Sequence, residues 1–265
     1  MKYDVVIVGG GSAGCVLANR LTEDSDRSVL LLEAGPDYVN FEELPIDLKD
    51  GYNVWRSAYG PHSWAYQAKG TPEQDATIEI PRGKAIGGSS SINGQVLFRG
   101  VPEDYDNWAS WGNDEWAFTK VLPYFRKLEN DLDFPGDDFH GSSGPIPVRR
   151  FKRAELLPTS SAFYDACVAL GFPQDSDQNH PDSDGIAHRP LNNIDGVRMS
   201  TALTYLNPAR HRMNLTVKGS VTVHRIMFKG KTAAGVLAES GGEVFSVEAE
   251  EIILASGAIA SPQLL

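Results

Sequence analysis

Three glycines near the amino terminus have the spacing of a phosphate-binding turn. Gly9, Gly11 and Gly14 fit the pattern G-x-G-x-x-G. In this pattern the first glycine allows a tight turn, the second lets the backbone approach a pyrophosphate, and the third lets a helix pack closely on a strand. Glu33 follows about twenty positions later, where a carboxylate can accept hydrogen bonds from ribose hydroxyls and disfavour a 2′-phosphate. The residue types therefore indicate binding of a dinucleotide.

The elements around this turn are those needed to position it. Val5–Val8 is a short β-branched run typical of a buried parallel strand, and Ala13–Leu21 has helical spacing. Ser28–Leu32 is a second apolar run that ends at Glu33. Together they predict a βαβ unit in which the start of the helix offers N–H groups to phosphates. A glycine-rich turn without a ligand is the alternative, and the motif alone does not separate FAD from NAD.

A second segment rich in small residues, Pro81–Gly94, has the composition of a ligand-binding loop. Gly83, Gly87 and Gly88 permit close backbone approach and unusual φ values, and a run of serines follows. The serines supply hydroxyls and N–H donors at a predicted helix start. A flexible Gly/Ser linker is the alternative. Apolar residues such as Ile86 interrupt the segment at packing intervals and favour the binding loop.

Composition and charge exclude several classes of protein. The chain has 265 residues and a formal net charge of -11, which disfavours nucleic acid and anionic membrane surfaces as partners. Its two distant cysteines, Cys15 and Cys167, form neither a disulfide framework nor a zinc site. We expect no signal peptide, because no cleavage site of small residues follows the first apolar run, and no membrane span, because no apolar stretch approaches the ~20 residues needed. The two cysteines suit a reducing environment, so we expect a cytoplasmic protein.

The middle of the chain offers weaker signals. Helical periodicity predicts a surface helix within 115–130 and another helix over Thr159–Leu170. The loop between them, Asp131–Pro147, carries four aspartates, but their spacing fits no EF-hand, so we interpret it as a solvated acidic loop and expect no metal. The aromatic residues of 38–80 are interpreted mainly as packed core, with cavity lining as the alternative. Alternating residues over 217–247 predict a β-meander.

Three motifs together resemble one known family. Pro81–Gly94 closely resembles the first signature of the glucose–methanol–choline (GMC) oxidoreductases, and Val101–Trp108 continues the match. Ser256–Leu265 is similar to the first half of that family's second signature. Within this family the chain is similar to choline dehydrogenases and alcohol oxidases. The resemblance covers essentially the whole chain. It implies an α/β fold with a glutathione-reductase-type, Rossmann-like FAD-binding domain and a β-meander.

The resemblance also implies a domain organisation. The FAD-binding domain is expected to be discontinuous, comprising residues 1–155 and 210–265. Residues 156–209 are expected to form part of an α+β substrate-binding domain, the rest of which lies beyond this sequence. The sequence does not indicate the oligomeric state.

The cofactor implied by the resemblance is noncovalent FAD, because Ile92 stands where some family members carry the histidine that attaches the flavin. The residues expected to contact it are Gly9, Gly11, Ser12, Ala13, Gly14, Glu33, Ala34, Ala85, Gly88, Asn93, Gly94, Gln95, Val96, Val223 and Gly257. The two glycine segments are thereby expected to meet at a single nucleotide.

The implied reaction is oxidation of a small-molecule alcohol to a carbonyl by hydride transfer to flavin N5, with re-oxidation by oxygen or another acceptor. The catalytic histidine and its histidine or asparagine partner are expected beyond residue 265. None of the six histidines, of which His140 is one, stands in a catalytic context of the family. The alternatives are a non-catalytic or truncated FAD-binding module, a redox-silent lyase and a nicotinamide-dependent dehydrogenase. The segment at 83–94 argues against the last of these.

Overall fold

The computed structural model describes residues 2–265 and divides the chain into two compact units. The first unit contains the chain up to Gly94 together with Gly196–Leu265, and the second contains Gln95–Asp195. The boundaries of these units differ from those of the predicted domains. The first unit and the predicted FAD-binding domain are nevertheless both discontinuous in sequence. The assignment of functional domains stays a prediction.

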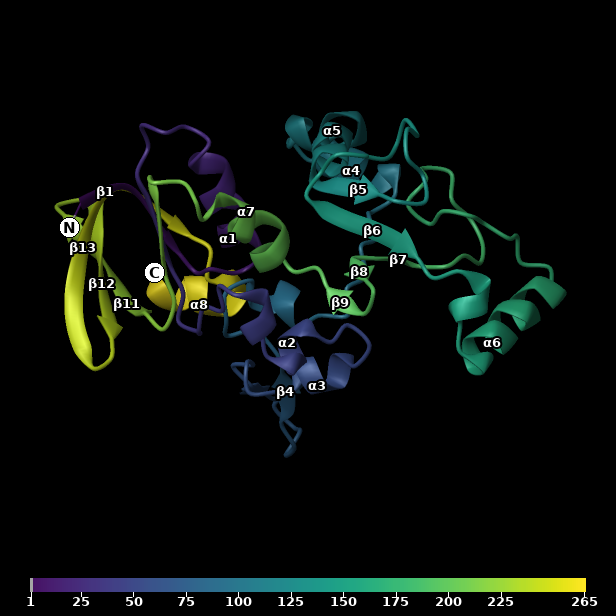
Figure 1. Ribbon diagram of the computed structural model, residues 1–265, viewed down its shortest axis with the longest axis horizontal. Helices are drawn as coiled ribbons and strands as arrows, with labels where there is room; N and C mark the ends of the chain where they lie inside the picture. The colour runs from purple at the N-terminus through teal and green to yellow at the C-terminus, as the bar shows by residue number, and fades with distance from the viewer. Residues whose placement is uncertain (1) are drawn as a thin grey trace. The chain divides into compact units, whose positions relative to one another are not determined.

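A six-stranded sheet organises the first unit, with the strand order β10-β2-β1-β13-β12-β11. Its strands are β1 (Lys2–Val8), β2 (Val29–Leu32), β10 (Leu215–Lys218), β11 (Thr222–Lys229), β12 (Thr232–Ser240) and β13 (Glu243–Leu254). β10, β2, β1 and β13 are parallel neighbours, whereas β13, β12 and β11 form an antiparallel meander. The predicted βαβ unit and β-meander are both confirmed and belong to one sheet (Figure 1).

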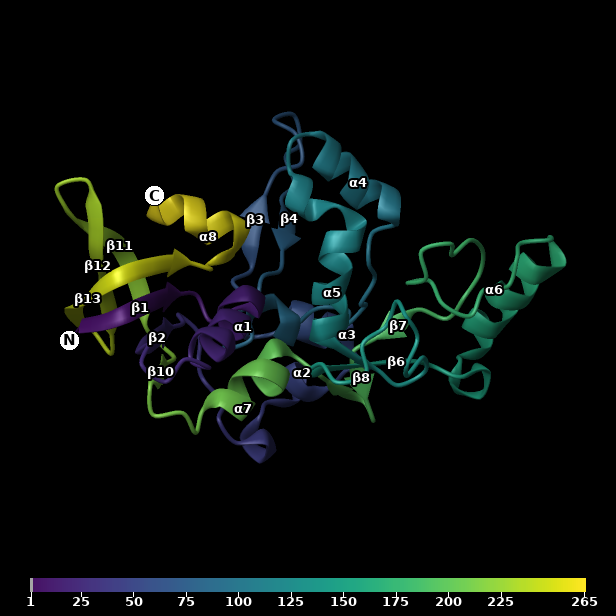
Figure 2. The same ribbon diagram turned by 90° about the horizontal axis from the view of Figure 1, so that it is seen from above.

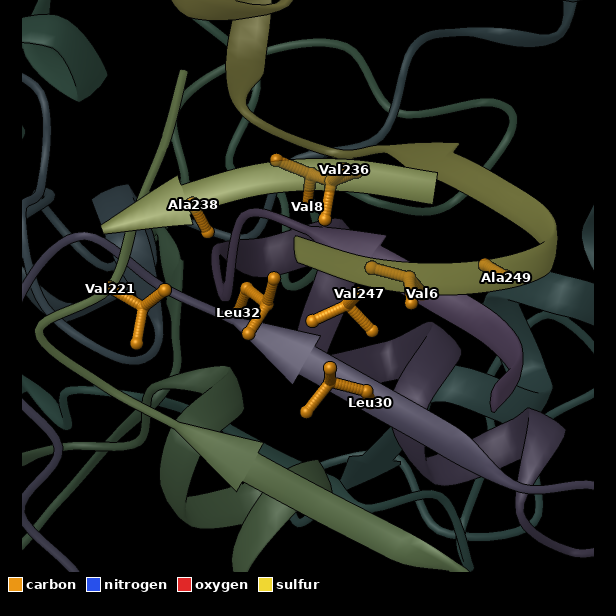
Figure 3. Close-up of a cluster of buried hydrophobic side chains, with 9 residues drawn as sticks. All are labelled: Val6, Val8, Leu30, Leu32, Val221, Val236, Ala238, Val247 and Ala249. Atoms are coloured by element: carbon orange, nitrogen blue, oxygen red, sulfur yellow. The ribbon is translucent and has the colours of Figure 1, made fainter. Parts of the chain in front are cut away.

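The central parallel strands β1 and β2 are buried on both faces, which explains their continuous apolar sequence. Successive side chains of a strand point to opposite faces. Val6 and Val8 therefore pack with residues of β2 and of the meander, as Figure 3 shows, whereas Val5 and Ile7 pack against α1 (Ser12–Leu21). All four of these β1 side chains are at most 3% exposed. The sheet is thus a rigid support for the loops at its edges.

β13 joins the two halves of the sheet. Its first residues pair antiparallel with β12, from Ser240↔Glu243 to Gly235↔Glu248. Its last residues pair parallel with β1, up to Val8↔Leu254. β1 and β13 therefore lie side by side although they come from opposite ends of the chain (Figure 2). Gly241 and Gly242 both have positive φ and close the tight turn before β13.

The remaining elements of the first unit are short. The helical ones are η1 (Phe41–Glu43), α2 (Ile46–Lys49), α3 (Val54–Ala58), η2 (Gly88–Ser91), the π-helical η5 (Ala202–Leu206), α7 (Asn207–Ala209) and α8 (Gly257–Leu264). The strands are β3 (Tyr66–Ala68), which pairs with β4 (Ile78–Ile80), and β9 (Val197–Arg198). η5 packs against α1 and contributes Leu206 to the core on that face of the sheet.

The second unit combines helices with a small sheet. Its helical elements are α4 (Pro102–Ser110), η3 (Asp114–Trp116), α5 (Phe118–Leu128), η4 (Arg153–Glu155) and α6 (Pro158–Ala169). Its strands are β5 (Glu129–Asp131), β6 (Ile146–Arg150), β7 (Pro190–Leu191) and β8 (Asn193–Ile194). The predicted helices correspond to α5 and α6. Tyr105, Phe118 and Val121 form an apolar cluster that holds α4 against α5.

Candidate functional site

A cavity of about 910 Å³ opens at the carboxyl ends of the parallel strands. In open parallel sheets this edge is where ligands bind. The lining includes the ends of β1, β2 and β13, the starts of α1 and α8, and parts of the 64–66, 82–89 and 221–224 segments. The cavity lies wholly within the first unit. Its size suits a ligand larger than a single nucleotide base.

Each of the three positions in the first motif has a glycine for a different physical reason. Gly9 has a φ of +104°, and a Cβ there would stand 2.6 Å from the carbonyl oxygen of Ala255. At Gly14 a Cβ would stand 1.9 Å from the carbonyl oxygen of Gly9, so packing inside the protein requires this glycine. At Gly11 the nearest atoms would be 3.9 Å away. The chain itself does not require a glycine at Gly11, which fits an approach by a ligand.

The first turn of α1 offers hydrogen-bond donors to the cavity. Gly11 is the N-cap residue and supplies no side-chain cap, and the first backbone bond of the helix runs from the N–H of Cys15 to the carbonyl of Gly11. Ser12 and Ala13 line the cavity. N–H groups in the first helical turn are left without intrahelical partners and carry the positive end of the helix dipole. This end of α1 suits an anionic group such as a pyrophosphate.

The second small-residue segment meets the first, as the sequence predicts. The N–H of Gly87 donates to the carbonyl of Gly10 over 2.7 Å. Gly88 has a φ of +52°, and a Cβ on it would stand 2.6 Å from the Cα of Gly11. Gly88 and Ser89 line the same cavity as Gly11. The two glycine segments, far apart in the sequence, therefore share one groove, and their meeting at a single nucleotide stays a prediction.

Glu33 occupies the end of β2 as predicted and is only 7% exposed. Its Oε2 accepts a hydrogen bond of 2.8 Å from the N–H of Gly10, and its Oε1 accepts one of 2.9 Å from the N–H of Gly35. Burial raises the pKa of Glu33, and these two N–H donors oppose the rise. The carboxylate lines the cavity and keeps free lone pairs on both oxygens, so it can also accept from a ligand hydroxyl.

The structure brings most of the predicted contact residues together. The predicted residues that line the cavity are Gly9, Gly11, Ser12, Ala13, Glu33, Ala34, Gly88, Val223 and Gly257. Gly14 is buried in the packing beneath the turn, and Ala85 is buried in a cluster with Leu48 and Ile92. Asn93 and Gly94 are exposed but do not line this cavity. Gln95 and Val96 belong to the second unit.

The sequence interpretation missed two aromatic residues of the cavity. Trp64 and Tyr66 line the cavity, and their rings are stacked, with planes 7° from parallel and centroids 5.8 Å apart. The Nζ of Lys84 lies 4.4 Å from the centroid of the Trp64 ring. Residues two apart in an extended segment point to the same side, so the Trp-x-Tyr spacing was an available signal. For these two residues the interpretation as packed core is wrong.

The interpretation of Asp131–Pro147 as a solvated loop is also wrong in part. Asp131 is fully buried, and Arg150 donates two hydrogen bonds to its carboxylate, of 3.0 and 2.9 Å. His140 is 2% exposed and lies between three carboxylates, with Nε2 2.7 Å from Asp177 and Nδ1 2.9 Å from Glu129 and 3.1 Å from Asp131. This cluster lies within the second unit.

Three cations balance this cluster: His140, Arg150 and Arg99, which pairs with Glu129. Burial alone would lower the pKa of His140, but the hydrogen bonds to Asp131, Asp177 and Glu129 raise it to about 11. His140 is therefore a cation at neutral pH. Glu129, Asp131 and His140 have ligand atoms within 4.8 Å of one another, a spacing that suits a metal ion. Because the imidazolium, Arg150 and Arg99 already occupy these oxygens, the cluster acts as a closed network of ion pairs.

Among residues 2–265, no helix combines the length and the apolar character needed to cross a membrane.

Comparison with protein families gives a match along nearly the entire chain. Residues 3–265 match the family described as GMC oxidoreductase. A GMC-type oxidoreductase of Rhodococcus erythropolis, itself described as uncharacterized, is 44% identical over 262 residues, covering 99% of this chain and 52% of the relative. The oxygen-dependent choline dehydrogenase of Staphylococcus haemolyticus is 41% identical, covering 100% of this chain and 46% of the relative.

Solved structures give the same result for the fold. The crystal structure of pyridoxine 4-oxidase from Mesorbium loti superposes with a TM-score of 0.91 and 32% sequence identity, covering 99% of this chain and 51% of the oxidase. The chain therefore spans about half the length of the relatives that it matches. The α/β fold expected from the sequence is confirmed.

Proposed function

Because this chain belongs to the GMC oxidoreductase family, whose members are oxidoreductases, we propose that it supplies the FAD site of an enzyme that oxidises an alcohol to a carbonyl. One observation carries the proposal. Gly11 and Gly88 come from segments nearly eighty positions apart in the sequence, yet their backbones lie against each other and both line one cavity at the carboxyl edge of a parallel sheet. In the proposal this cavity is the FAD site.

The residues that line the cavity fit FAD part by part. The start of α1, with Gly11 and Ser12, would hold the pyrophosphate, because its N–H groups and dipole favour an anion. Glu33 would accept from the adenosine ribose. The segment around Val223 lines the cavity next to Glu33, since the N–H of Val221 donates to the carbonyl of Glu33 over 2.9 Å. We therefore propose that Val223 lies beside the adenine.

The rest of the cofactor would follow the second small-residue segment. Gly88 and Ser89 line the cavity, and the segment continues through Asn93 and Gly94, whose exposed backbone we propose lies along the flavin. Gln95 and Val96 are proposed as further contacts from the sequence resemblance. Binding is proposed to be noncovalent, because the buried hydrocarbon side chain of Ile92 offers no atom that could attach a flavin.

The chemistry divides between the cofactor, this chain and the remainder of the protein. Bound FAD would supply N5 as the acceptor for a hydride from the alcohol carbon, and the hydroxyl proton would pass to a base. The residues of this chain bind and orient the cofactor. We propose that the base, a histidine paired with a second histidine or an asparagine, is supplied by the part of the family fold that this chain does not span. Oxygen or another acceptor would then take up the electrons.

The test uses protein purified from the complete reading frame. We expect flavin absorption bands in the purified protein and release of intact FAD into the supernatant when the protein is precipitated by acid. Anaerobic addition of a primary alcohol, with choline and pyridoxine as the first candidates because relatives are named for them, should bleach the bands. Protein without flavin bands that cannot be reconstituted with FAD would refute the proposal.

The same experiment separates the alternatives. Flavin bands that no alcohol bleaches would favour a redox-silent lyase or a non-catalytic FAD-binding module. We also propose a cytoplasmic location, supported by the two free cysteines, Cys15 and Cys167. Fractionation of the source cells with an antibody against the chain would test the location.

A further inference from the structure

Arg198, at the end of β9, is a fully buried cation whose hydrogen bonds go only to backbone carbonyls. Its Nε donates to the carbonyl of Asn93 over 3.2 Å. Its Nη1 donates to the carbonyls of Asp47, Leu48 and Ser91, each over 3.2 Å. Within residues 2–265, its Nη2 has no hydrogen-bond partner and no carboxylate accepts from it. One guanidinium thus joins α2 to the end of the second small-residue segment.

The charge of Arg198 is only weakly compensated. Burial lowers its pKa, and Asp50 and Asp47 act on it in the opposite direction through space. Both carboxylates have other partners, since Asp47 lies 2.6 Å from Nδ1 of His62 and Asp50 lies 3.3 Å from Nη1 of Arg56. Burying a charge without a paired counter-charge is costly. The carbonyl oxygens around Arg198 offset part of this cost through their dipoles.

The hydrogen bonds of Arg198 fix the direction of two peptide groups in the second small-residue segment, those that follow Ser91 and Asn93. The described peptide bonds are all trans, and in a trans peptide the carbonyl and the following N–H point to opposite sides. Because the carbonyl of Asn93 points at Arg198, the N–H of Gly94 points away from it. That N–H donates to no group among residues 2–265. A Cβ added at Gly94 would meet no atom within 4 Å, so the side of this residue on which a side chain would lie is open.

The segment from Ser91 to Asn93, whose carbonyls Arg198 holds, cannot rotate freely. Leu48, Ala85 and Ile92 form a buried apolar cluster next to the carbonyls that Arg198 holds. The N–H of Ile92 donates to the carbonyl of Ser89 over 3.2 Å, which closes the turn of η2. The backbone of the segment is therefore fixed before any ligand arrives, a condition that lowers the ordering cost of binding.

We infer that Arg198 is a positioning residue for the flavin: it aims the N–H of Gly94 at the ring system and adds a buried positive charge that stabilises the reduced, more negative flavin. The inference rests on the proposed function, because it takes the segment at Asn93 and Gly94 to lie along the flavin. Arg198 acts through the backbone and through its field and does not contact the reacting atoms.

The first experiment compares Arg198→Met and Arg198→Lys with the unchanged protein, all purified from the complete reading frame. The FAD dissociation constant and the flavin midpoint potential are measured for each. Loss of the charge in Arg198→Met should weaken the preference for reduced over oxidised flavin about tenfold, which lowers a two-electron potential by about 30 mV. Arg198→Lys should keep the potential closer to the unchanged value while FAD binds more weakly, because an ammonium cannot reproduce the guanidinium fork.

Folding of the variants is checked by circular dichroism and thermal unfolding. A folded Arg198→Met protein with an unchanged midpoint potential and an unchanged FAD dissociation constant would overturn the inference.

A second experiment needs no variant and covers the case in which Arg198→Met does not fold. Amide hydrogen exchange of the peptide around Gly94 is followed in the protein with and without FAD. We expect fast exchange of the Gly94 amide without FAD and protection when FAD is bound. Unchanged exchange in a protein that binds FAD and is reduced by an alcohol would refute the role of Gly94 while leaving the proposed function intact. A protein that binds no FAD would instead refute the proposed function.

Discussion

Replacement of Gly11 by alanine separates a glycine required by a ligand from one required by packing. A Cβ at Gly11 would lie 3.9 Å from its nearest neighbours, so the protein can accommodate the methyl group. The φ of -78° at this position is open to alanine. Alanine is a poorer N-cap than glycine, which should cost less than about 1 kcal/mol of stability. Gly11→Ala should therefore fold with nearly unchanged stability.

The same substitution should weaken FAD binding strongly. The methyl group would enter the space through which the pyrophosphate approaches the first turn of α1, and it would lengthen at least one hydrogen bond to a charged oxygen. Such a bond contributes about 1.5–3 kcal/mol. At about 1.4 kcal/mol per tenfold change, we expect the dissociation constant of FAD to rise between roughly tenfold and 100-fold.

Gly14→Ala is the matched comparison. A Cβ at Gly14 would stand 1.9 Å from the carbonyl oxygen of Gly9, so backbone has to move, and overpacking of this kind costs about 1–3 kcal/mol or more. Urea unfolding and quenching of flavin fluorescence measure stability and affinity for both variants. The reasoning fails if Gly11→Ala binds FAD as tightly as the unchanged protein, or if it is destabilised as much as Gly14→Ala.

Three further predictions concern the buried network and the cavity wall. His140→Gln removes one partner of a buried ion network and should cost about 3–5 kcal/mol in urea unfolding, whereas the exposed His211→Gln should change stability by less than about 0.5 kcal/mol. Because the folded-state pKa of His140 is raised to about 11, its contribution is complete below about pH 6.5 and is lost as pH rises toward 11; stability that is flat from pH 7 to 10 would contradict this. Asp131 has a lowered pKa, because its hydrogen bonds to His140 and Arg150 outweigh burial, so unfolding free energy should also fall below about pH 4. Trp64→Ala should weaken FAD binding with little change in melting temperature, and equal weakening by Trp111→Ala, which lies outside the cavity, would argue for a nonspecific effect.

Local sequence patterns predicted the parts of the site that depend on neighbouring residues. The turn from Gly9 to Gly14, its flanking strands and the position of Glu33 all lie within a single βαβ unit, where glycine conformation and apolar periodicity act over short distances. The turns at Gly230 and Gly241 were readable for the same reason, since positive φ selects glycine.

Long-range contacts explain what local patterns missed. Asp131 belongs to an acidic stretch whose composition is typical of a solvated loop. Its carboxylate can be buried because it pairs with Arg150 and His140, which lie further along the chain. Arg198 likewise gave no signal in the sequence, because its partners are backbone carbonyls more than a hundred positions away, whose direction no residue type encodes.

The sequence by itself determined that this protein has a glycine-rich turn at the end of a parallel strand, because glycine and β-branched residues restrict the backbone locally. Only the tertiary structure decided that Trp64 faces the same cavity and that Arg198 holds the segment at Asn93. The physical reason is that burial and hydrogen bonding between distant segments depend on where the whole chain places them, which short-range conformational preferences do not specify.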